Sequence, residues 1–294
     1  MEQSEEIRNM KNGITITGFA DEIAESLDTQ IQVLKKLGIS YVEMRGVDGK
    51  PLVEHSLEEV REIRRKLDEN GIRLSSVGSP IGKIYITDPF EEHFELFKKT
   101  VEIAKIMDVS YIRLFSFFIP EGKNPADYKE EVFRRTERFV EYAKEQQVVL
   151  LHENEKEIYG DIASRCQELM EKFYCDNYKA VFDFANFVQC GQDTLEAYRM
   201  LKPYIEYIHI KDALKESGQV VPSGMGDGNV EMILKELLNG GYEGFLSLEP
   251  HLADFTGFGA LENGTCTEKK KLTGEEAYTL AYESLKKILD RIEQ

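Results

Sequence analysis

Four residues that can ligate a metal stand at the ends of four apolar segments in the second half of the chain. These residues are Glu153, Asp183, His209 and Glu249, and the segments are VVLLHE, AVFDFA, YIEYIHI and GFLSLE. A carboxylate at the end of a buried strand costs desolvation energy unless a cation or a partner charge compensates it. Three carboxylates and one imidazole suit Mn²⁺, Mg²⁺, Co²⁺ or Zn²⁺, with positions left for water or substrate.

The four residues also share a phase within their predicted strands. Side chains two residues apart lie on one face of a strand, so Val181 aligns with Asp183 and Tyr207 aligns with His209. A lone acid after a strand is commonly a helix N-cap, and a lone histidine is commonly a packed core residue. Four such residues in matching phase on successive strands favour a metal site over these structural alternatives.

Short apolar runs alternate along the chain with longer segments of helical periodicity. Leu57, Val60 and Ile63 recur at helical spacing, for example, and charged residues occupy the opposite face. Eight strand–helix units predict an α/β fold, a single (β/α)8 TIM barrel, with the active site at the carboxyl ends of the strands. An open doubly wound sheet fits less well, because the first turn, GFADEIAES, lacks the glycine-rich motif of that fold. The predicted strands span residues 14–20, 41–46, 72–78, 111–117, 148–153, 180–185, 204–210 and 244–249.

The whole chain, residues 1–294, is expected to form one domain with a polar N-terminal extension (1–12) and a long loop after the last strand (251–273). That loop is expected to be a lid over the site or a contact in a homo-oligomer. With 37 basic and 54 acidic residues, the net charge is −17 and opposes nucleic-acid binding. We find no secretory signal, no membrane-spanning run and no cysteine pair suited to zinc, so we expect a cytoplasmic protein with reduced thiols.

Four stretches of the chain carry a family resemblance. HENE, VFDFAN, YIHIKDA and GDGNVEMILKELLNGGYEGFLSLEPH resemble the xylose-isomerase-like TIM barrel superfamily, and within it the sugar phosphate isomerase/epimerase group. The resemblance implies one divalent ion, commonly Mn²⁺, bound by Glu153, Asp183, His209 and Glu249. It also implies that Glu153 and Glu249 double as the acid and the base.

The sequence departs from well-studied ketose epimerases of this superfamily at Asn186, where they have histidine, and at Lys215, where they have arginine. Lysine cannot form the bidentate fork of arginine, so the substrate of those epimerases is not carried over. Asn186 is still expected to bind the substrate, as are Lys211, Arg45 and Glu43. Salt bridges with neighbouring side chains are the alternative for the last three residues.

The expected function is that of a metal-dependent isomerase or epimerase acting on a small polyol, keto-sugar or sugar phosphate. Such an enzyme moves a proton next to a carbonyl, while the metal stabilises the enediolate and two carboxylates act as base and acid. A hydro-lyase of the keto-inositol dehydratase type would use the same parts, and a barrel that binds a ligand without turnover also stays open. A DNA-repair enzyme of the endonuclease IV type is excluded, because its three zinc ions need many more than the five histidines present.

Three further features have plainer interpretations. His152 lies in opposite phase to Glu153, so we expect it to be a packed histidine or to lie behind the metal ligands. Asp212 is expected to be a cap or a partner for a basic group. The glycine-rich loop 222–229 leads into a helix and could cradle an anion there, although ordinary turn chemistry is favoured.

Overall fold

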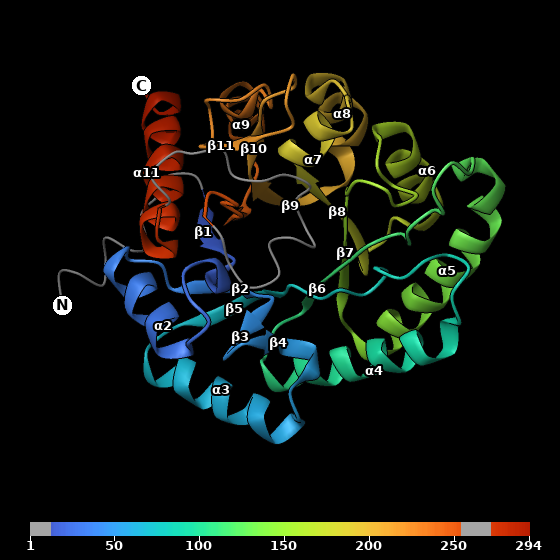
Figure 1. Cartoon of the computed structure of the whole chain (residues 1–294), viewed down its shortest axis with the longest axis horizontal. Helices are drawn as coiled ribbons and strands as arrows, with labels where there is room; N and C mark the ends of the chain where they lie inside the picture. Colours follow the sequence, from blue (N-terminus) through green and yellow to red (C-terminus); the bar gives the residue numbers. More distant parts are fainter. Residues whose placement is uncertain (1–12, 254–271) are drawn as a thin grey trace.

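Eight parallel strands form one sheet in the order β1-β12-β9-β8-β7-β6-β5-β2, in a computed structural model that describes residues 13–253 and 272–294. A parallel bridge between Phe19 and Glu43 joins the two end strands, so the sheet closes into a barrel (Figure 1). The predicted (β/α)8 fold is confirmed. The strands are β1 (Ile14–Gly18), β2 (Tyr41–Met44), β5 (Arg73–Val77), β6 (Tyr111–Leu114), β7 (Val149–Glu153), β8 (Tyr178–Asp183), β9 (Ile205–Ile210) and β12 (Gly244–Leu248). The N-terminal extension and most of the predicted 251–273 loop lie outside the described residues.

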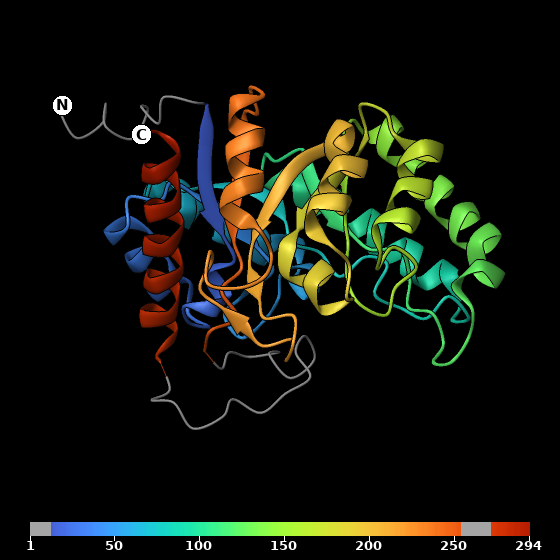
Figure 2. The same ribbon diagram turned by 90° about the horizontal axis from the view of Figure 1, so that it is seen from above.

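Helices cover the outer face of the barrel all the way round (Figure 1). α3 begins at a capping box, in which Ser56 and Glu59 each bond the other's backbone N–H, and it buries Val60, Ile63 and Leu67 as the periodicity predicts. Figure 2 shows β1 standing between α9 and α11. The helices are α2 (Leu27–Lys36), α3 (Leu57–Glu69), α4 (Phe90–Ile106), α5 (Lys129–Gln146), α6 (Ala163–Phe173), α7 (Phe184–Gln189), α8 (Thr194–Leu201), α9 (Val230–Asn239) and α11 (Gly274–Ile292), with 3₁₀ turns η1 (Ala20–Glu22), η2 (Leu52–Glu54), η3 (Pro125–Tyr128) and η4 (Lys202–Tyr204).

The barrel interior is filled by alternate residues of the strands. Leu151, Val181 and Tyr207 form a buried cluster, against which Val149 packs. Val149 and Leu151 belong to the face of β7 that ends in Glu153, as predicted. A floor of apolar and aromatic side chains therefore lies below the ends of the strands, and it leaves the carboxyl ends as the place for polar chemistry.

Two short antiparallel hairpins follow strands β2 and β9. The first pairs β3 (Gly46–Val47) with β4 (Lys50–Pro51), and the second pairs β10 (Asp212–Ala213) with β11 (Val220–Val221). Both hairpins fix the chain just beyond a strand end, where site residues lie. None of the helices in the described part of the chain has the length and apolar character needed to cross a bilayer.

Candidate metal centre

The four predicted ligands come together at the carboxyl ends of β7, β8, β9 and β12. One ligand atom from each of Glu153, Asp183, His209 and Glu249 lies within 4.8 Å of the others. Asp183 and His209 are direct partners in the register of β8 and β9. All four side chains are buried. The prediction that these residues converge from one half of the barrel rim is therefore confirmed.

Glu153 divides its two carboxylate oxygens between different partners. Oε1 lies 2.9 Å from Nδ1 of His209, on the side of the other ligands. Oε2 accepts a hydrogen bond from Nη1 of Arg113 at 3.1 Å. The guanidinium therefore holds the outer oxygen, and the inner oxygen faces the centre of the cluster.

Glu249 also divides its two carboxylate oxygens between different partners. Its Oε2 accepts a bond from Nζ of Lys211 at 2.9 Å and lies 3.7 Å from Nδ1 of His209. Its Oε1 accepts from Nη1 of Arg45 at 3.4 Å. Each of the two glutamates is thus held from outside by one arginine, Arg113 for the first and Arg45 for the second.

Asp183 is both a helix cap and a member of the centre. Its Oδ1 accepts the backbone N–H of Asn186 at 2.7 Å, which caps the N-terminus of α7. Its Oδ2 is buried and accepts no hydrogen bond within the described part of the chain, although Nζ of Lys211 lies 3.2 Å away. A buried carboxylate oxygen of this kind fits a place beside a cation.

His209 is oriented by a second carboxylate behind it. Its Nε2 lies 3.1 Å from Oε2 of Glu43, and this oxygen also accepts from Oγ of Ser247 at 2.6 Å. A carboxylate bonded to one ring nitrogen fixes the tautomer and leaves the other nitrogen for a metal. Nδ1 is therefore the ligand atom that His209 offers.

Burial and neighbouring charges shift the pKa values of these groups in opposite directions. Burial raises the pKa of Glu153, but His209 and Arg113 outweigh it and lower that pKa to about 2. Burial raises the pKa of Asp183 to about 8, with Lys211 opposing the shift and the glutamates adding to it. Burial lowers the pKa of His209, yet the carboxylates of Glu153 and Glu43 hold it well above its usual value. Without a cation, protons and Lys211 thus balance the carboxylates.

The donor set fits a divalent cation. Each carboxylate has one oxygen held by a donor outside the cluster and one oxygen turned toward the centre, where Nζ of Lys211 lies near the inner oxygens of Glu249 and Asp183, and His209 adds a nitrogen. Four such donors leave coordination positions open on an ion that prefers five or six ligands, such as Mn²⁺ or Mg²⁺. Zn²⁺ and Co²⁺ also accept this mixture of oxygen and nitrogen.

The residues predicted to bind substrate also lie at this centre, where they contact the ligands. Lys211, Arg45 and Glu43 bond Glu249 and His209, as described above. Nδ2 of Asn186 donates to the carbonyl of Asn154 at 2.9 Å and to Oε1 of Glu153 at 3.4 Å. These bonds position the ligands. Contact of the same side chains with a substrate stays a prediction.

Several site residues carried no prediction from the sequence. Arg113 on β6 could have been found, because a charged residue inside the apolar run YIRLFSF needs a buried partner. Glu22 lies 3.3 Å from Nη2 of Arg45, accepts the N–H of His251 at 2.7 Å, and has its pKa raised to about 7 by burial. No local sequence pattern predicts a role for Glu22 or His251, because the two residues contact each other from opposite ends of the chain.

The features with plainer interpretations are also resolved. His152 packs outside the barrel, where its ring centroid lies 6.3 Å from that of Tyr178, as its phase predicts. Asp212 does not cap a helix or pair with a basic group within the described residues, so that expectation is wrong. Its carboxylate accepts backbone N–H bonds from Ala213 and from three glycines of the 222–229 loop, namely Gly224, Gly226 and Gly228. The loop amides are thus occupied by the protein's own anion, as ordinary turn chemistry requires.

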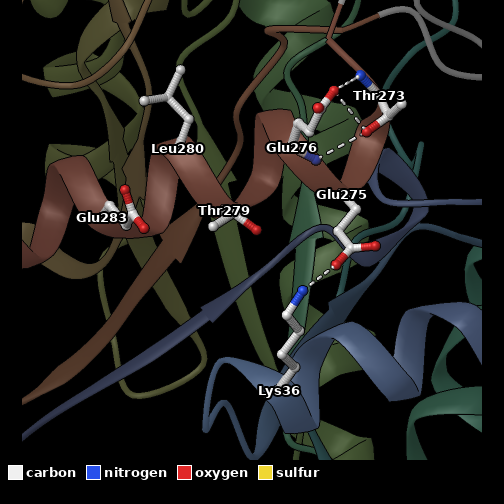
Figure 3. Close-up of a pocket in the computed structure, with 7 residues that line it drawn as sticks. All are labelled: Lys36, Thr273, Glu275, Glu276, Thr279, Leu280 and Glu283. Carbon is white, nitrogen blue, oxygen red and sulfur yellow. Dashed lines mark hydrogen bonds and ion pairs between the residues drawn. The ribbon is translucent and has the colours of Figure 1, made fainter.

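A surface depression between α2 and α11 is separate from the metal centre. Figure 3 shows the ion pair that spans it, from Nζ of Lys36 to Oε1 of Glu275 at 2.6 Å. Both side chains are largely exposed, and exposed pairs of this kind contribute little stability. The depression contains none of the predicted ligands. Its lining residues are Lys36, Thr273, Glu275, Glu276, Thr279, Leu280 and Glu283.

Comparison with known proteins gives a sequence relative and several structural neighbours. A 3-dehydroshikimate dehydratase from Bacillus anthracis is 20% identical over 207 residues, covering 69% of this chain and 72% of that protein. The structure of a D-tagatose 3-epimerase-like protein is 17% identical with a TM-score of 0.71, covering 95% of this chain and 98% of the other. The structure of an IOLI protein with a zinc atom is 17% identical with a TM-score of 0.71, covering 94% and 98%. At these identities the structural likeness shows the fold.

The family itself is shown by a sequence model that spans most of the barrel. The model is described as xylose isomerase-like TIM barrel, and it matches residues 31–264. This span includes all four residues of the candidate metal centre and seven of the eight barrel strands. The chain belongs to the xylose isomerase-like TIM barrel family.

Proposed function

We propose that this protein is a divalent-metal-dependent isomerase or epimerase of a small sugar or keto-sugar. The observation that carries the proposal is the set of inward-facing donors, one oxygen from each of Glu153, Asp183 and Glu249 and Nδ1 of His209. Mn²⁺ is the ion we expect, because three oxygens and one imidazole suit it and leave room for two substrate oxygens. The bound ion would supply Lewis-acid stabilisation for negative charge that develops on those oxygens.

The chain's own residues supply the proton transfers in this proposal. Glu153 and Glu249 approach from β7 and β12, with β8 and β9 between them in the sheet. Two carboxylates on different sides of a substrate can remove a proton from one face and return it to the other, which gives epimerisation. Transfer on one face between neighbouring carbons gives isomerisation. Lys211, which lies 2.9 Å from Oε2 of Glu249, can donate a hydrogen bond to a substrate oxygen beside it.

A substrate without phosphate is the form that the site supports best. The amides of Gly224, Gly226 and Gly228 already bond the carboxylate of Asp212. A phosphate group in this loop would have to displace that buried carboxylate. We therefore expect sugars and keto-sugars without a phosphate group to be better substrates than sugar phosphates.

A hydro-lyase is the second candidate, favoured by the dehydratase relative from Bacillus anthracis. The same base would remove the proton, and a hydroxyl at the β-position would leave as water. The two candidates share the metal centre and differ in the substrate's leaving group.

The experiment is proton exchange in D₂O with the protein reloaded with Mn²⁺ and a panel of ketoses, aldoses and keto-inositols. We expect deuterium at the carbon beside the carbonyl, seen by nuclear magnetic resonance, together with an epimer or isomer. Replacement of the base, Glu153→Gln or Glu249→Gln, is expected to slow exchange about 10²- to 10⁴-fold. An unsaturated product with ultraviolet absorbance would select the hydro-lyase. Absence of both exchange and dehydration across the panel would contradict the enzymatic proposal.

A further inference from the structure

Phe19 occupies the point where the barrel closes, directly after β1. Its backbone N–H donates to the carbonyl of Leu248 on β12 at 2.9 Å, and the residue forms the bridge to Glu43 on the other side. The side chain is fully buried, at 0% exposure, so it does not line an open surface. Its ring contacts three residues of the candidate metal centre, namely Arg45, Arg113 and His209.

Two guanidinium groups lie against the ring of Phe19. The Cζ of Arg45 lies 4.6 Å from the ring centroid, and the Cζ of Arg113 lies 4.8 Å from it. The ring of His209 meets it edge to face, with centroids 5.2 Å apart and planes at 79°. Distances below about 6 Å are those of cation–π contacts, which are strongest where water is excluded.

Each of these arginines holds the outer oxygen of one glutamate. Nη1 of Arg45 lies 3.4 Å from Oε1 of Glu249, and Nη1 of Arg113 lies 3.1 Å from Oε2 of Glu153. One aromatic side chain therefore contacts a group bonded to each glutamate. It also contacts the imidazole of His209.

The geometry points to Phe19 as the positioning residue of the metal centre, an inference that rests on the proposed metal-dependent function. The ring sets the two guanidinium groups, and these turn Glu153 and Glu249 so that each presents one oxygen to the ion. This arrangement keeps both carboxylates from binding the ion through two oxygens, and so leaves positions open for the substrate.

The aromatic contacts matter most for Arg113. Its Nε is buried and has no hydrogen-bond partner among residues 13–253 and 272–294. Its hydrogen bonds are those from Nη1 to Glu153 and from Nη2 to the carbonyl of Gly78 at 3.3 Å. The rings of Phe19 and Phe115, the latter 4.9 Å from Cζ, supply the remaining contacts that fix the plane of the guanidinium. Loss of the Phe19 ring would let this plane rotate.

The test measures Mn²⁺ affinity by isothermal titration calorimetry for wild type, Phe19→Leu, Arg113→Met and the double variant. We expect Phe19→Leu to weaken binding about 10- to 100-fold, as loss of an outer partner of a metal ligand does. Because Phe19 acts in part through Arg113 and in part through Arg45, the loss of affinity in the double variant should be smaller than the sum of the two single losses. Phe19→Tyr keeps an aromatic ring and is expected to retain most of the affinity.

Phe97→Leu is the matched control, because Phe97 is also 0% exposed but packs in the helical layer against Phe94 and Phe139. It should lose stability to urea yet bind Mn²⁺ as wild type does. Equal affinity of Phe19→Leu and wild type would overturn the inference, and so would additive losses in the double variant. If the wild-type protein itself binds no Mn²⁺, the proposed function fails instead, so the two failures are distinguishable.

Discussion

At the scale of single residues, the candidate metal centre divides each carboxylate between two sets of partners, one outside the cluster and one inside it. Arg113, Arg45 and the N–H of Asn186 hold the outer oxygens of the three acids. The inner oxygens then point to one place, where a bound cation would compensate their charge. An exposed site would not need such support, since water would serve as the outer donor.

Glu43 provides a prediction about the support of His209. Glu43→Gln replaces the carboxylate that lies 3.1 Å from Nε2 with a neutral amide, a weaker partner for the imidazole N–H. We expect Mn²⁺ affinity to fall about 10- to 100-fold with the fold intact, measured by calorimetry and circular dichroism. The control is Glu155→Gln, which removes an ion pair with Lys83 at 3.1 Å and should leave affinity within about twofold. Unchanged affinity in Glu43→Gln would show that this carboxylate does not support the ligand.

The four ligands could be predicted from the sequence because each follows an apolar run in which a charge is out of place. Their partners were harder to predict, since Arg45 and Glu22 come from the first loops of the chain and meet Glu249 only when the barrel closes. Phe19 is an ordinary core residue by type. Only the three-dimensional contacts of its ring distinguish it.

At the scale of elements, hydrogen bonds join the loop between β5 and α4 to the neighbouring loop at the carboxyl end of the barrel. Its backbone pairs with the segment after β6, through bonds such as Phe117 N–H to the carbonyl of Gly82 at 3.1 Å. Gly82 has φ +89°, and a Cβ there would lie 2.0 Å from the carbonyl oxygen of Phe115. The N–H of Gly82 donates to Nε2 of His93 on α4 at 2.7 Å. This bond requires neutral histidine.

The stability of the protein should therefore fall in mild acid through His93. Burial lowers its pKa from 6.5 to about 4, so the unfolded chain binds a proton at this residue between those pH values and the folded chain does not. The contribution of neutral His93 to the free energy of unfolding is complete above pH 6.5 and is lost as the pH falls toward 4. From pH 7 to pH 5, wild type should lose about 2 kcal/mol more unfolding free energy than His93→Gln, measured by urea titration. Equal losses of unfolding free energy in wild type and in His93→Gln would contradict the low pKa of His93 in the folded protein.

Seven of the eight barrel strands could be predicted to within two residues at each end, because their apolar runs are long enough to be recognised, whereas the strand predicted as 111–117 ends three residues earlier, at Leu114. The hairpins β3–β4 and β10–β11 could not be predicted, since a strand of two residues has no periodicity. The 222–229 loop was correctly assigned to turn chemistry. Its partner, Asp212, was not identified, because a carboxylate that binds amides up to 16 residues away leaves no local signal.

At the scale of the whole molecule, a strongly acidic chain surrounds a centre in which basic groups are concentrated. The net charge is −17, yet Arg45, Arg113, Lys211 and His209 all lie at the buried acids of the centre. These internal cations balance the carboxylates when no metal is bound. The fold is therefore expected to form without metal, unlike domains whose folding requires the ion.

Metal binding should accordingly raise stability without being required for folding. With EDTA, we expect one cooperative thermal transition by calorimetry. Mn²⁺ at about 100 times its Kd adds about 2.7 kcal/mol, which corresponds to a rise in Tm of roughly 5 °C for a chain of this size. An excess of EDTA should reverse the shift. Unfolding in EDTA at room temperature would contradict the internal balance of charge.

The most direct measurement is divalent metal content by plasma mass spectrometry, on wild type and on Asp183→Ala. Both proteins would be purified without added metal or chelator, and then reloaded with Mn²⁺ and freed of excess ion. We predict about one ion per wild-type chain and close to none in the variant, because Asp183 contributes the buried Oδ2 to the centre. No ion in wild type after reloading, or equal content in the two proteins, would contradict the metal centre on which the proposed function rests.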